Sequence, residues 1–328
     1  MPTLSLIVIV YDMPRQAMNT LYSLSARHQR NVQEADYEIV VIENRSPHTL
    51  NPTAVAQLGC NIRYTLRDET GVSPAAAINE GLRQAQGRCI GLMIDGARMV
   101  TPRVIECALM AHRMAEHSLL AIPSFNLGFQ LQHHHLDTGY NEAIEQQLLQ
   151  QTRWQDNGYR LYDISCIGEA NPRGVFQSFM ESNCYFSSQR NFTAIGGADE
   201  TFQYPGGGGL NLHMFRALGM LVHSNPYFIT PGEGSFHQFH GGVSTSQRED
   251  REAMLVPPRI QLESHWGDQP FQALEREPML LGAVSKHAQP FLHYSAQRGW
   301  KRLNRLHKHT QPFWRDDHHH TRYTEQAS

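Results

Sequence analysis

The sequence predicts an α/β fold with a mostly parallel, Rossmann-type sheet flanked by helices. Three short apolar runs in the first hundred residues each end in a carboxylate; they span 4–12, 37–43 and 89–95. Runs of β-branched residues without polar alternation are typical of strands buried on both faces. The intervals between the runs are long enough for crossover helices, so we expect parallel strands.

The carboxylates that end these runs, Asp12, Glu43 and Asp95, indicate a ligand site. In an open parallel sheet the ligand crevice lies outside the carboxyl ends of the strands. One acid after a strand is often only a turn former or a helix cap. Three acids in register favour a site.

The remaining elements of the first half follow in alternation. The expected elements are a helix within 14–28, a strand at 61–66, a helix at 73–86, a helix from 102 and a strand at 119–123. Pro74 and Gly87 mark the start and end of the second helix. The order predicts a βαβαβ half-sheet.

The second half of the chain is less regular. Residues 126–172, rich in Gln, His and Asn, are expected to form an insertion with an amphipathic piece at 142–151. A strand-like stretch covers 176–188, a glycine run at 206–209 predicts a flexible loop, and a helix follows at 210–218. Pro257-Pro258 is a boundary signal. We therefore expect a main domain over 1–250, a helical extension over 251–307 and a disordered tail over 308–328.

Composition narrows the possible partners and compartments. The 28 basic and 31 acidic residues give a formal charge of -3, and no basic block interleaved with aromatics was found, so nucleic acid is not an expected partner. Five cysteines without CxxC spacing predict reduced thiols. No stretch approaches the roughly 20 apolar residues that span a bilayer. We expect a soluble cytoplasmic protein, with peripheral membrane contact left open.

In their order and spacing, these segments resemble the nucleotide-sugar-dependent glycosyltransferases of family 2, which have the GT-A fold and include bacterial enzymes of surface-polysaccharide pathways. The resemblance covers about residues 4–245; the matching pieces are Tyr11-Asp12, Glu43-Asn44-Arg45-Ser46, 71–87 with Asn79, 89–97 at the DxD position, and 195–202. No single piece is decisive. The resemblance implies a hexosyltransferase-type enzyme, with the insertion on its acceptor side.

The resemblance assigns the donor site to Tyr11, Asp12, Glu43, Asn79 and Asp95. Glu43 replaces the Asp that receives the nucleobase, and a carboxylate suits the ring N–H of uracil or the amino edge of another base. The donor would be a UDP- or GDP-linked sugar. Asp95 matches the first Asp of DxD, which approaches the ribose and the metal-bound diphosphate.

A divalent Mn²⁺ or Mg²⁺ is also implied, but Ala97 replaces the second Asp of DxD. The compensating ligands are expected to be His240, which we favour, and His237, in a glycine-flanked segment. Imidazole suits Mn²⁺ better than Mg²⁺, although it favours Zn²⁺ more strongly still. Alternatively, both histidines make only packing and hydrogen-bond contacts.

The chain departs from the family pattern a second time at the general base, the carboxylate that deprotonates the acceptor hydroxyl. Inverting members carry an acidic pair before the last helix, whereas 205–212 contains no acid. The candidates are Asp199, Glu200 and Glu181, any of which could instead have only a structural role. Inversion and retention of the anomeric configuration both stay open.

The expected activity is transfer of a sugar to a hydroxyl of a glycan, lipid-linked or small-molecule acceptor. The alternative is a degenerate relative that binds nucleotide or glycan without turnover. A nucleotidylyltransferase comes third, because the glycine-rich basic signature after the first strand is missing. The absence of GxGxxG there disfavours a dehydrogenase.

Overall fold

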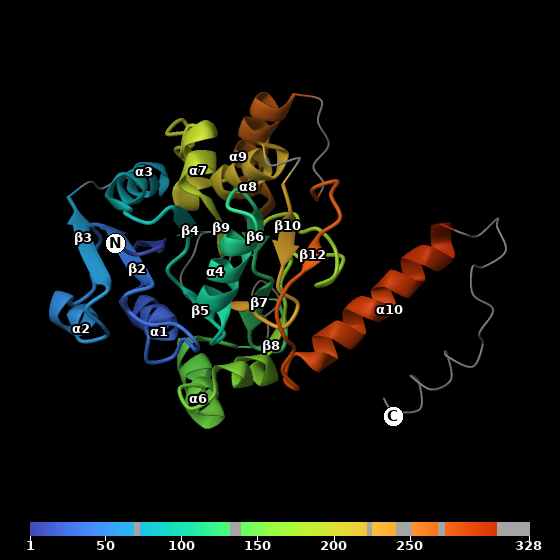
Figure 1. The fold of residues 1–328 in the computed structure, drawn as a ribbon, viewed down its shortest axis with the longest axis horizontal. Helices are drawn as coiled ribbons and strands as arrows, with labels where there is room; N and C mark the ends of the chain where they lie inside the picture. Colours follow the sequence, from blue (N-terminus) through green and yellow to red (C-terminus); the bar gives the residue numbers. More distant parts are fainter. Residues whose placement is uncertain (69–72, 132–138, 222–224, 241–250, 268–272, 307–328) are drawn as a thin grey trace.

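The computed structural model of the chain describes residues 1–68, 73–131, 139–221, 225–240, 251–267 and 273–306 (Figure 1). Two sheets form its framework. The larger has the strand order β12-β10-β6-β9-β4-β1-β2-β3. Its strands are β1 (Leu4–Val10), β2 (Tyr37–Asn44), β3 (Ile62–Arg67), β4 (Cys89–Met93), β6 (Leu119–Ala121), β9 (Tyr185–Ser188), β10 (Tyr227–Ile229) and β12 (Met279–Leu280).

The mostly parallel sheet is confirmed. β1 pairs in parallel with both β2 and β4, and only β9 runs antiparallel to its neighbours. All residues of β1, β2 and β4 are buried, as their continuous apolar runs predict. The register pairs Val10 with Glu43 and Val8 with Met93. Asp12, Glu43 and Asp95 therefore lie at one edge.

Helices cover both faces of the larger sheet (Figure 1). One apolar core joins β1, β2 and β4 to α1 (Pro14–Leu24), α2 (Pro52–Ala56) and α4 (Val104–Met114). The core on the other face includes α3 (Ala75–Gln84), α7 (Gln189–Ala194), α8 (Leu210–Leu221) and Leu262 of α9 (Arg251–Trp266). The sheet is thus the middle layer of three.

The smaller sheet carries part of the candidate site. Its order is β5-β11-β7-β8, comprising β5 (Arg98–Val100), β11 (Ser235–His237), β7 (Ser124–Leu127) and β8 (Ser165–Ile167). A third core packs it against α6 (Glu142–Thr152), the 3₁₀ helix Gly158–Ile164 and the start of α10 (Gln289–Leu306). The expected insertion thus supplies much of this layer. Its amphipathic piece is α6.

The strand expected over 176–188 is wrong for most of its length. Only Tyr185–Ser188 is a strand. Before it, the Ser182 hydroxyl donates to the carbonyl oxygens of Ile122 and Cys184, which favours a local turn. The apolar pattern has another cause, because Phe179 in this loop is fully buried in the second core.

Pro257 and Pro258, taken from the sequence as a boundary signal, both lie inside α9. This helix packs on the glycine run, where a Cβ at Gly209 would come 2.3 Å from Leu262. The run is therefore a packing surface rather than the expected flexible loop. The extension is not purely helical either, because β12 pairs with β10.

The expected tail over 308–328 lies outside the described residues, as does the end of the main domain at 241–250. All five cysteines are free. Within the described part of the chain, no helix combines the length and the apolar character needed to cross a bilayer.

Candidate functional site

Asp95, His237 and His240 form a cluster at the carboxyl edge of the larger sheet, called here the Asp95 cluster. Asp95 follows β4, His237 ends β11 and His240 lies three residues beyond it. The Nε2 atom of His237 lies 2.9 Å from Oδ2 of Asp95 and 3.0 Å from Nε2 of His240. Nε2 of His240 lies 3.9 Å from Oδ1 of Asp95. One potential ligand atom from each residue lies within 4.8 Å of the other two, a grouping that could hold a metal ion.

Strand pairing brings these distant segments together. β5 begins three residues after Asp95, and it pairs antiparallel with β11 so that Arg98 lies opposite His237. The backbone N–H of Gln238 donates to the Ala97 carbonyl oxygen at 2.8 Å. Residue 96 must be glycine, because a Cβ there would come 2.8 Å from the Ile9 carbonyl oxygen. The two sheets therefore meet at Asp95.

The segment that carries the histidines is held from two helices. Gln16 of α1 donates to the Phe239 carbonyl oxygen at 2.8 Å, and the Phe239 N–H donates to Glu145 of α6 at 2.6 Å. The Gln238 side chain, fully buried, donates to the Gln16 carbonyl oxygen at 2.9 Å. These bonds hold the two residues between His237 and His240, which limits the positions that His240 can adopt.

The protonation states in the cluster suit a cation. Burial opposes ionisation of Asp95, but contact with His237 and the nearby His240 and Arg98 outweigh it, so the pKa of this carboxyl falls well below its usual range. Burial lowers the pKa of His237 to about 4, against the opposing effect of Asp95. At neutral pH the carboxylate is ionised and His237 is neutral, the forms that bind metals.

The spacing of the cluster also fits a metal ion. Ligand atoms at right angles on a divalent ion, about 2.1 Å from it, lie about 3 Å apart. Two of the three separations, 2.9 and 3.0 Å, have this value. One carboxylate with two imidazoles suits Mn²⁺ better than Mg²⁺. The residues present therefore fit the implied divalent ion.

The missing second Asp of DxD is replaced in the structure by a buried Ala97, whose N–H donates to Oδ1 of Asp95 at 3.0 Å. The next residue, Arg98, brings its Nε to 3.6 Å from Oδ2 of Asp95 and donates from Nη1 to Ser124 at 2.9 Å. The sequence reading missed Arg98. Its position three residues after Asp95 was the available signal.

Of the three general-base candidates, Glu181 interacts electrostatically with Arg98, the residue that contacts Asp95. It is partly buried, and the Asn211 amide of α8 donates to its carboxylate at 2.8 Å. Burial raises the pKa of Glu181, which the charge of Arg98 partly offsets. Asn211 lies in the stretch 205–212, which contains no acid, so Glu181 brings a carboxylate to that region from another segment.

Asp199 and Glu200 make their contacts elsewhere. Asp199 pairs with His265 of α9 at 3.0 Å, and Glu200 accepts from Asn79 at 2.8 Å. Asn79 also donates to the Ala198 carbonyl oxygen at 2.9 Å. The structure thus joins three of the predicted site residues in a brace between α3, α9 and the turn after α7. None of these contacts reaches the Asp95 cluster.

Tyr11, Asp12 and Glu43, which were predicted to bind the nucleotide-sugar donor, lie at the carboxyl ends of strands that end at the same edge as Asp95 but form separate contacts. Glu43 is fully buried, accepting from the Tyr64 hydroxyl at 2.5 Å and from the Leu50 N–H at 3.1 Å. Burial raises the pKa of Glu43. Asp12, with a left-handed φ of 52°, accepts from the His48 N–H at 3.3 Å and contacts Nδ1 of that residue at 2.9 Å. Tyr11 is exposed.

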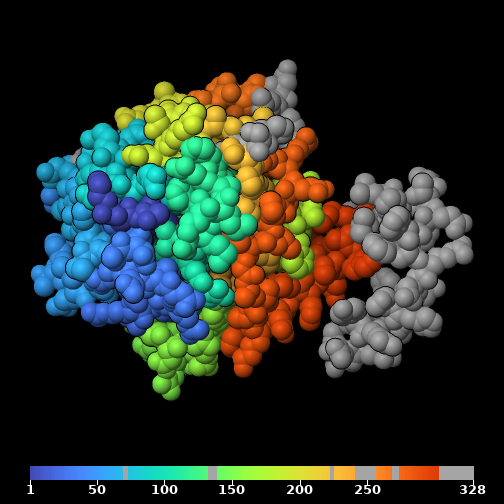
Figure 2. Space-filling view, in the orientation of Figure 1, coloured from blue at the N-terminus to red at the C-terminus, as the bar shows by residue number. Residues whose placement is uncertain are grey.

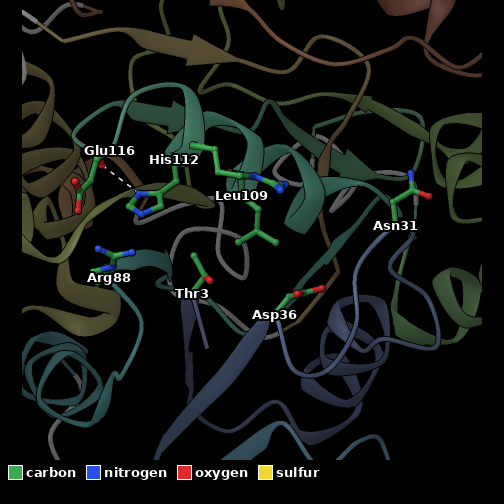
Figure 3. A pocket seen from close by; sticks show the side chains of 8 residues that line it. Thr3, Asn31, Asp36, Arg88, Leu109, His112 and Glu116 are labelled. Atoms are coloured by element: carbon green, nitrogen blue, oxygen red, sulfur yellow. Dashed lines mark hydrogen bonds between the residues drawn. The ribbon is translucent and has the colours of Figure 1, made fainter. Parts of the chain in front are cut away.

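A hollow of about 480 Å³ lies at the opposite edge of the larger sheet (Figure 3). Thr3, Asp36 and Arg88 in its lining immediately precede β1, β2 and β4. His112 contacts the Glu116 carbonyl oxygen at 3.2 Å beside it. Because strands β1, β2 and β4 run parallel, this amino-end hollow is separate from the Asp95 cluster.

Comparison with solved structures shows a likeness to S. aureus TarS. TarS 1-349 in complex with UDP-GlcNAc matches with a TM-score of 0.51 and 12% identity over 95% of this chain and 76% of that chain. The complex of TarS 1-349 with UDP matches with a TM-score of 0.50 and 12% identity, over 94% of this chain and 73% of that chain. In a longer TarS structure, with a TM-score of 0.45 and 12% identity over 92% of this chain, the match spans 44% of the other chain.

At this identity the likeness shows the fold, which is similar to that of GT-A glycosyltransferases. The fold implied by the sequence resemblance is thereby confirmed. No protein-family model and no curated protein matches the chain.

Proposed function

We propose that the chain is a nucleotide-sugar-dependent glycosyltransferase. The observation that carries this proposal is the convergence of Asp95, His237 and His240 at the carboxyl edge of a GT-A-like sheet. A ligand site is expected at this edge in open parallel sheets. The TarS structures with UDP and UDP-GlcNAc support a nucleotide sugar as the donor.

The Asp95 cluster would hold the divalent ion, with Mn²⁺ the better match to its donor set. When bound, the ion would neutralise the charge that develops on the diphosphate leaving group. Asp95 supplies the charged ligand, and the hydrogen bonds from α1 and α6 fix the turn that presents His240. Water and donor phosphate would fill the remaining positions, so metal binding without nucleotide should be weak.

Glu181 is our proposed general base. The Glu181 carboxyl accepts a hydrogen bond from Asn211 and interacts with the charge of Arg98. Arg98 in turn contacts Asp95, which links Glu181 to the Asp95 cluster. A raised pKa makes a carboxylate a stronger base, which favours proton abstraction from an acceptor hydroxyl. A hydroxyl activated in this way would attack the anomeric carbon by a single displacement, with inversion. Asp199 and Glu200 are disfavoured because their contacts lie in the α3–α9 brace.

Glu43 and Asp12 remain the candidates for the nucleoside end of the donor. They follow strands adjacent to β4, so a nucleotide extending along this edge from Asp95 would meet them. Glu43 could bind a base only by exchanging or sharing the hydrogen bonds it now accepts from Tyr64 and Leu50. The exposed Tyr11, next to Asp12 in the chain, would stack its ring on the nucleobase of the donor.

Release of nucleoside diphosphate from a panel of UDP- and GDP-sugars, with Mn²⁺ or with a chelator, tests the proposal. We expect release that requires both metal and Asp95. The buried Ala97 in place of the second Asp favours the alternative of binding without turnover. Metal-dependent binding with no release for any donor or acceptor would support that alternative. Absence of both binding and release would contradict the donor-site proposal.

A further inference from the structure

α10 is the most cationic element of the described chain and extends away from the two sheets (Figure 1). Residues 278–306 contain five lysines and arginines and no acid, whereas the whole chain has a formal charge of -3. Trp300 lies between Arg298 and Lys301, so this basic segment contains an aromatic residue, contrary to the expectation from composition. It therefore differs from the rest of the surface in both charge and aromatic content.

The two faces of α10 have different environments. On the inner face, Phe291 and Leu292 pack against the third core, and the buried Ser295 hydroxyl accepts from the Val175 N–H at 3.0 Å. On the outer face, Tyr294 and Arg298 lie one turn apart and are exposed. Residues three and four apart share a helix face, so Lys301 continues this stripe. The inner contacts thus fix which side chains face outward.

The outer stripe is cationic and lacks acids to balance it. Arg298 lies 5.6 Å from the centre of the Tyr294 ring, and its Nη1 donates to the Tyr294 hydroxyl at 3.1 Å. No ion pair among the described residues involves Arg298 or Lys301. Arg302 donates to the Arg173 carbonyl oxygen at 3.3 Å, and burial with the nearby charges of Arg173 and Arg298 lowers its pKa. These cations gather despite mutual repulsion, which an anionic partner would relieve.

Exposed apolar side chains accompany the cations. Met279 and Leu280 of β12, Val284, Tyr294 and Trp300 are all at least 41% exposed. Figure 2 shows the orange and red C-terminal segment on the outside of the molecule. Helices that lie in a membrane interface combine Lys and Arg on one side with Trp, Phe or Leu that enter the headgroup region. Nucleic acid would satisfy the charge but not the aliphatic residues.

We propose that α10 and the adjoining β12 segment bind the surface of an anionic phospholipid bilayer. Arg298 and Lys301 would contact lipid phosphate groups, while Tyr294 and Trp300 would lie at the headgroup level, where such rings are enriched. This surface is independent of the Asp95 cluster. It gives the chain a way to reach a membrane with no spanning helix in the described part.

The test is flotation of the full chain with vesicles of phosphatidylcholine alone and of phosphatidylcholine mixed with phosphatidylglycerol. Each cation near an anionic surface is worth about a fivefold change in partition, so R298A/K301A should bind roughly 30-fold more weakly. The control R83A/R153A removes two exposed cations elsewhere with the same change in net charge and should bind like the parent. Added salt should release the parent protein.

Several results would overturn the proposal. These are equal binding to neutral vesicles, no binding to anionic vesicles, or unchanged binding of R298A/K301A. Binding to an oligonucleotide but not to vesicles would assign the stripe to nucleic acid instead. A salt-insensitive dimer that R298A/K301A dissociates, with no vesicle binding, would assign it to a second copy. The salt titration uses only the parent protein, so it decides even if a variant fails to fold.

Discussion

His237 and His240 share one carboxylate, so the preference for His240 drawn from the sequence has no geometric support over His237. Nε2 of His237 is in fact the closer of the two to Asp95, at 2.9 Å against 3.9 Å. The sequence placed them three residues apart without fixing whether they lie in a helix, strand or loop. The end of β11 between them is what allows both rings to face one point.

Replacing either histidine by alanine should weaken Mn²⁺-dependent donor binding to a similar extent. Loss of an outer-shell partner costs about 10–100-fold in metal affinity, so loss of a direct ligand should cost at least about 100-fold. Calorimetry with Mn²⁺ and nucleotide measures the effect, and His265→Ala, in the distant brace, is the matched control. If both variants bind like the parent, the imidazoles are not ligands.

Glu181→Gln should lower kcat by about 10²–10⁴-fold with little change in donor KM, because a general base acts in the transition state. Glutamine can still contact the Asn211 amide, which preserves the local hydrogen bonding. Steady-state release of nucleoside diphosphate at saturating acceptor measures the change. Glu200→Gln is the control expected to keep near-parental kcat. If Glu200→Gln lowered kcat more than Glu181→Gln, Glu200 in the turn after α7 would be the general base instead.

At the scale of elements, α6 connects the insertion to the metal cluster through Glu145. This carboxyl is fully buried and contacts Arg15 of α1 at 3.4 Å and the Phe239 N–H at 2.6 Å. Burial raises its pKa to about 7, although the Phe239 N–H and Arg15 act in the opposite direction. The sequence showed an amphipathic helix here but not its partner, since Glu145 and Phe239 are far apart in the chain.

The raised pKa of Glu145 predicts a pH-dependent stability. Its folded-state pKa of about 7 exceeds the unfolded value of about 4.3, so the folded chain holds this proton more tightly. The stabilisation is complete below about pH 4.3 and is lost as pH rises through 7, a change on the order of 3 kcal/mol.

Urea unfolding at a series of pH values should show this loss in the parent and not in Glu145→Gln. Glu263→Gln, on an exposed side chain of α9, should retain the parental profile. Matching profiles for the parent and Glu145→Gln would mean that another group controls stability in this range.

The packing of α9 on the glycine run gives a second prediction for an element. Gly209→Ala should destabilise the fold by about 1–3 kcal/mol, because the added Cβ would come 2.3 Å from Leu262. Leu262→Ala should relieve part of this cost in the double variant, which a double-mutant cycle by denaturant unfolding would detect. Gly299→Ala, where the nearest atom lies 3.8 Å away, is the control. Additive effects would mean that α9 does not lie against Gly209.

For the whole molecule, the sequence predicted the sheet better than the site. The sequence runs that end at Asp12, Glu43 and Asp95 are apolar without polar alternation. This pattern indicates strands that are buried on both faces of the sheet. The antiparallel β9 and the added β12 depend on register and on long-range pairing, which no local pattern encodes. Glu145 was missed because the contact of α6 with Phe239 joins residues far apart in the chain. Arg98 stands only three residues after Asp95, but it is the pairing of β5 with β11 that places it opposite His237.

We expect the nucleotide donor to stabilise the folded chain against thermal unfolding only when the metal ion is also bound. A ligand at 100 times its Kd stabilises the folded state by about 2.7 kcal/mol, which for a chain of this size is on the order of 5 °C in Tm. Because Asp95 would contact both the ion and the diphosphate, we expect UDP or a UDP-sugar to raise Tm with Mn²⁺ and to do little with a chelator. Asp95→Asn should abolish the shift, whereas Asp199→Asn should keep it. An equal shift without metal would instead support nucleotide binding that depends on protein groups alone.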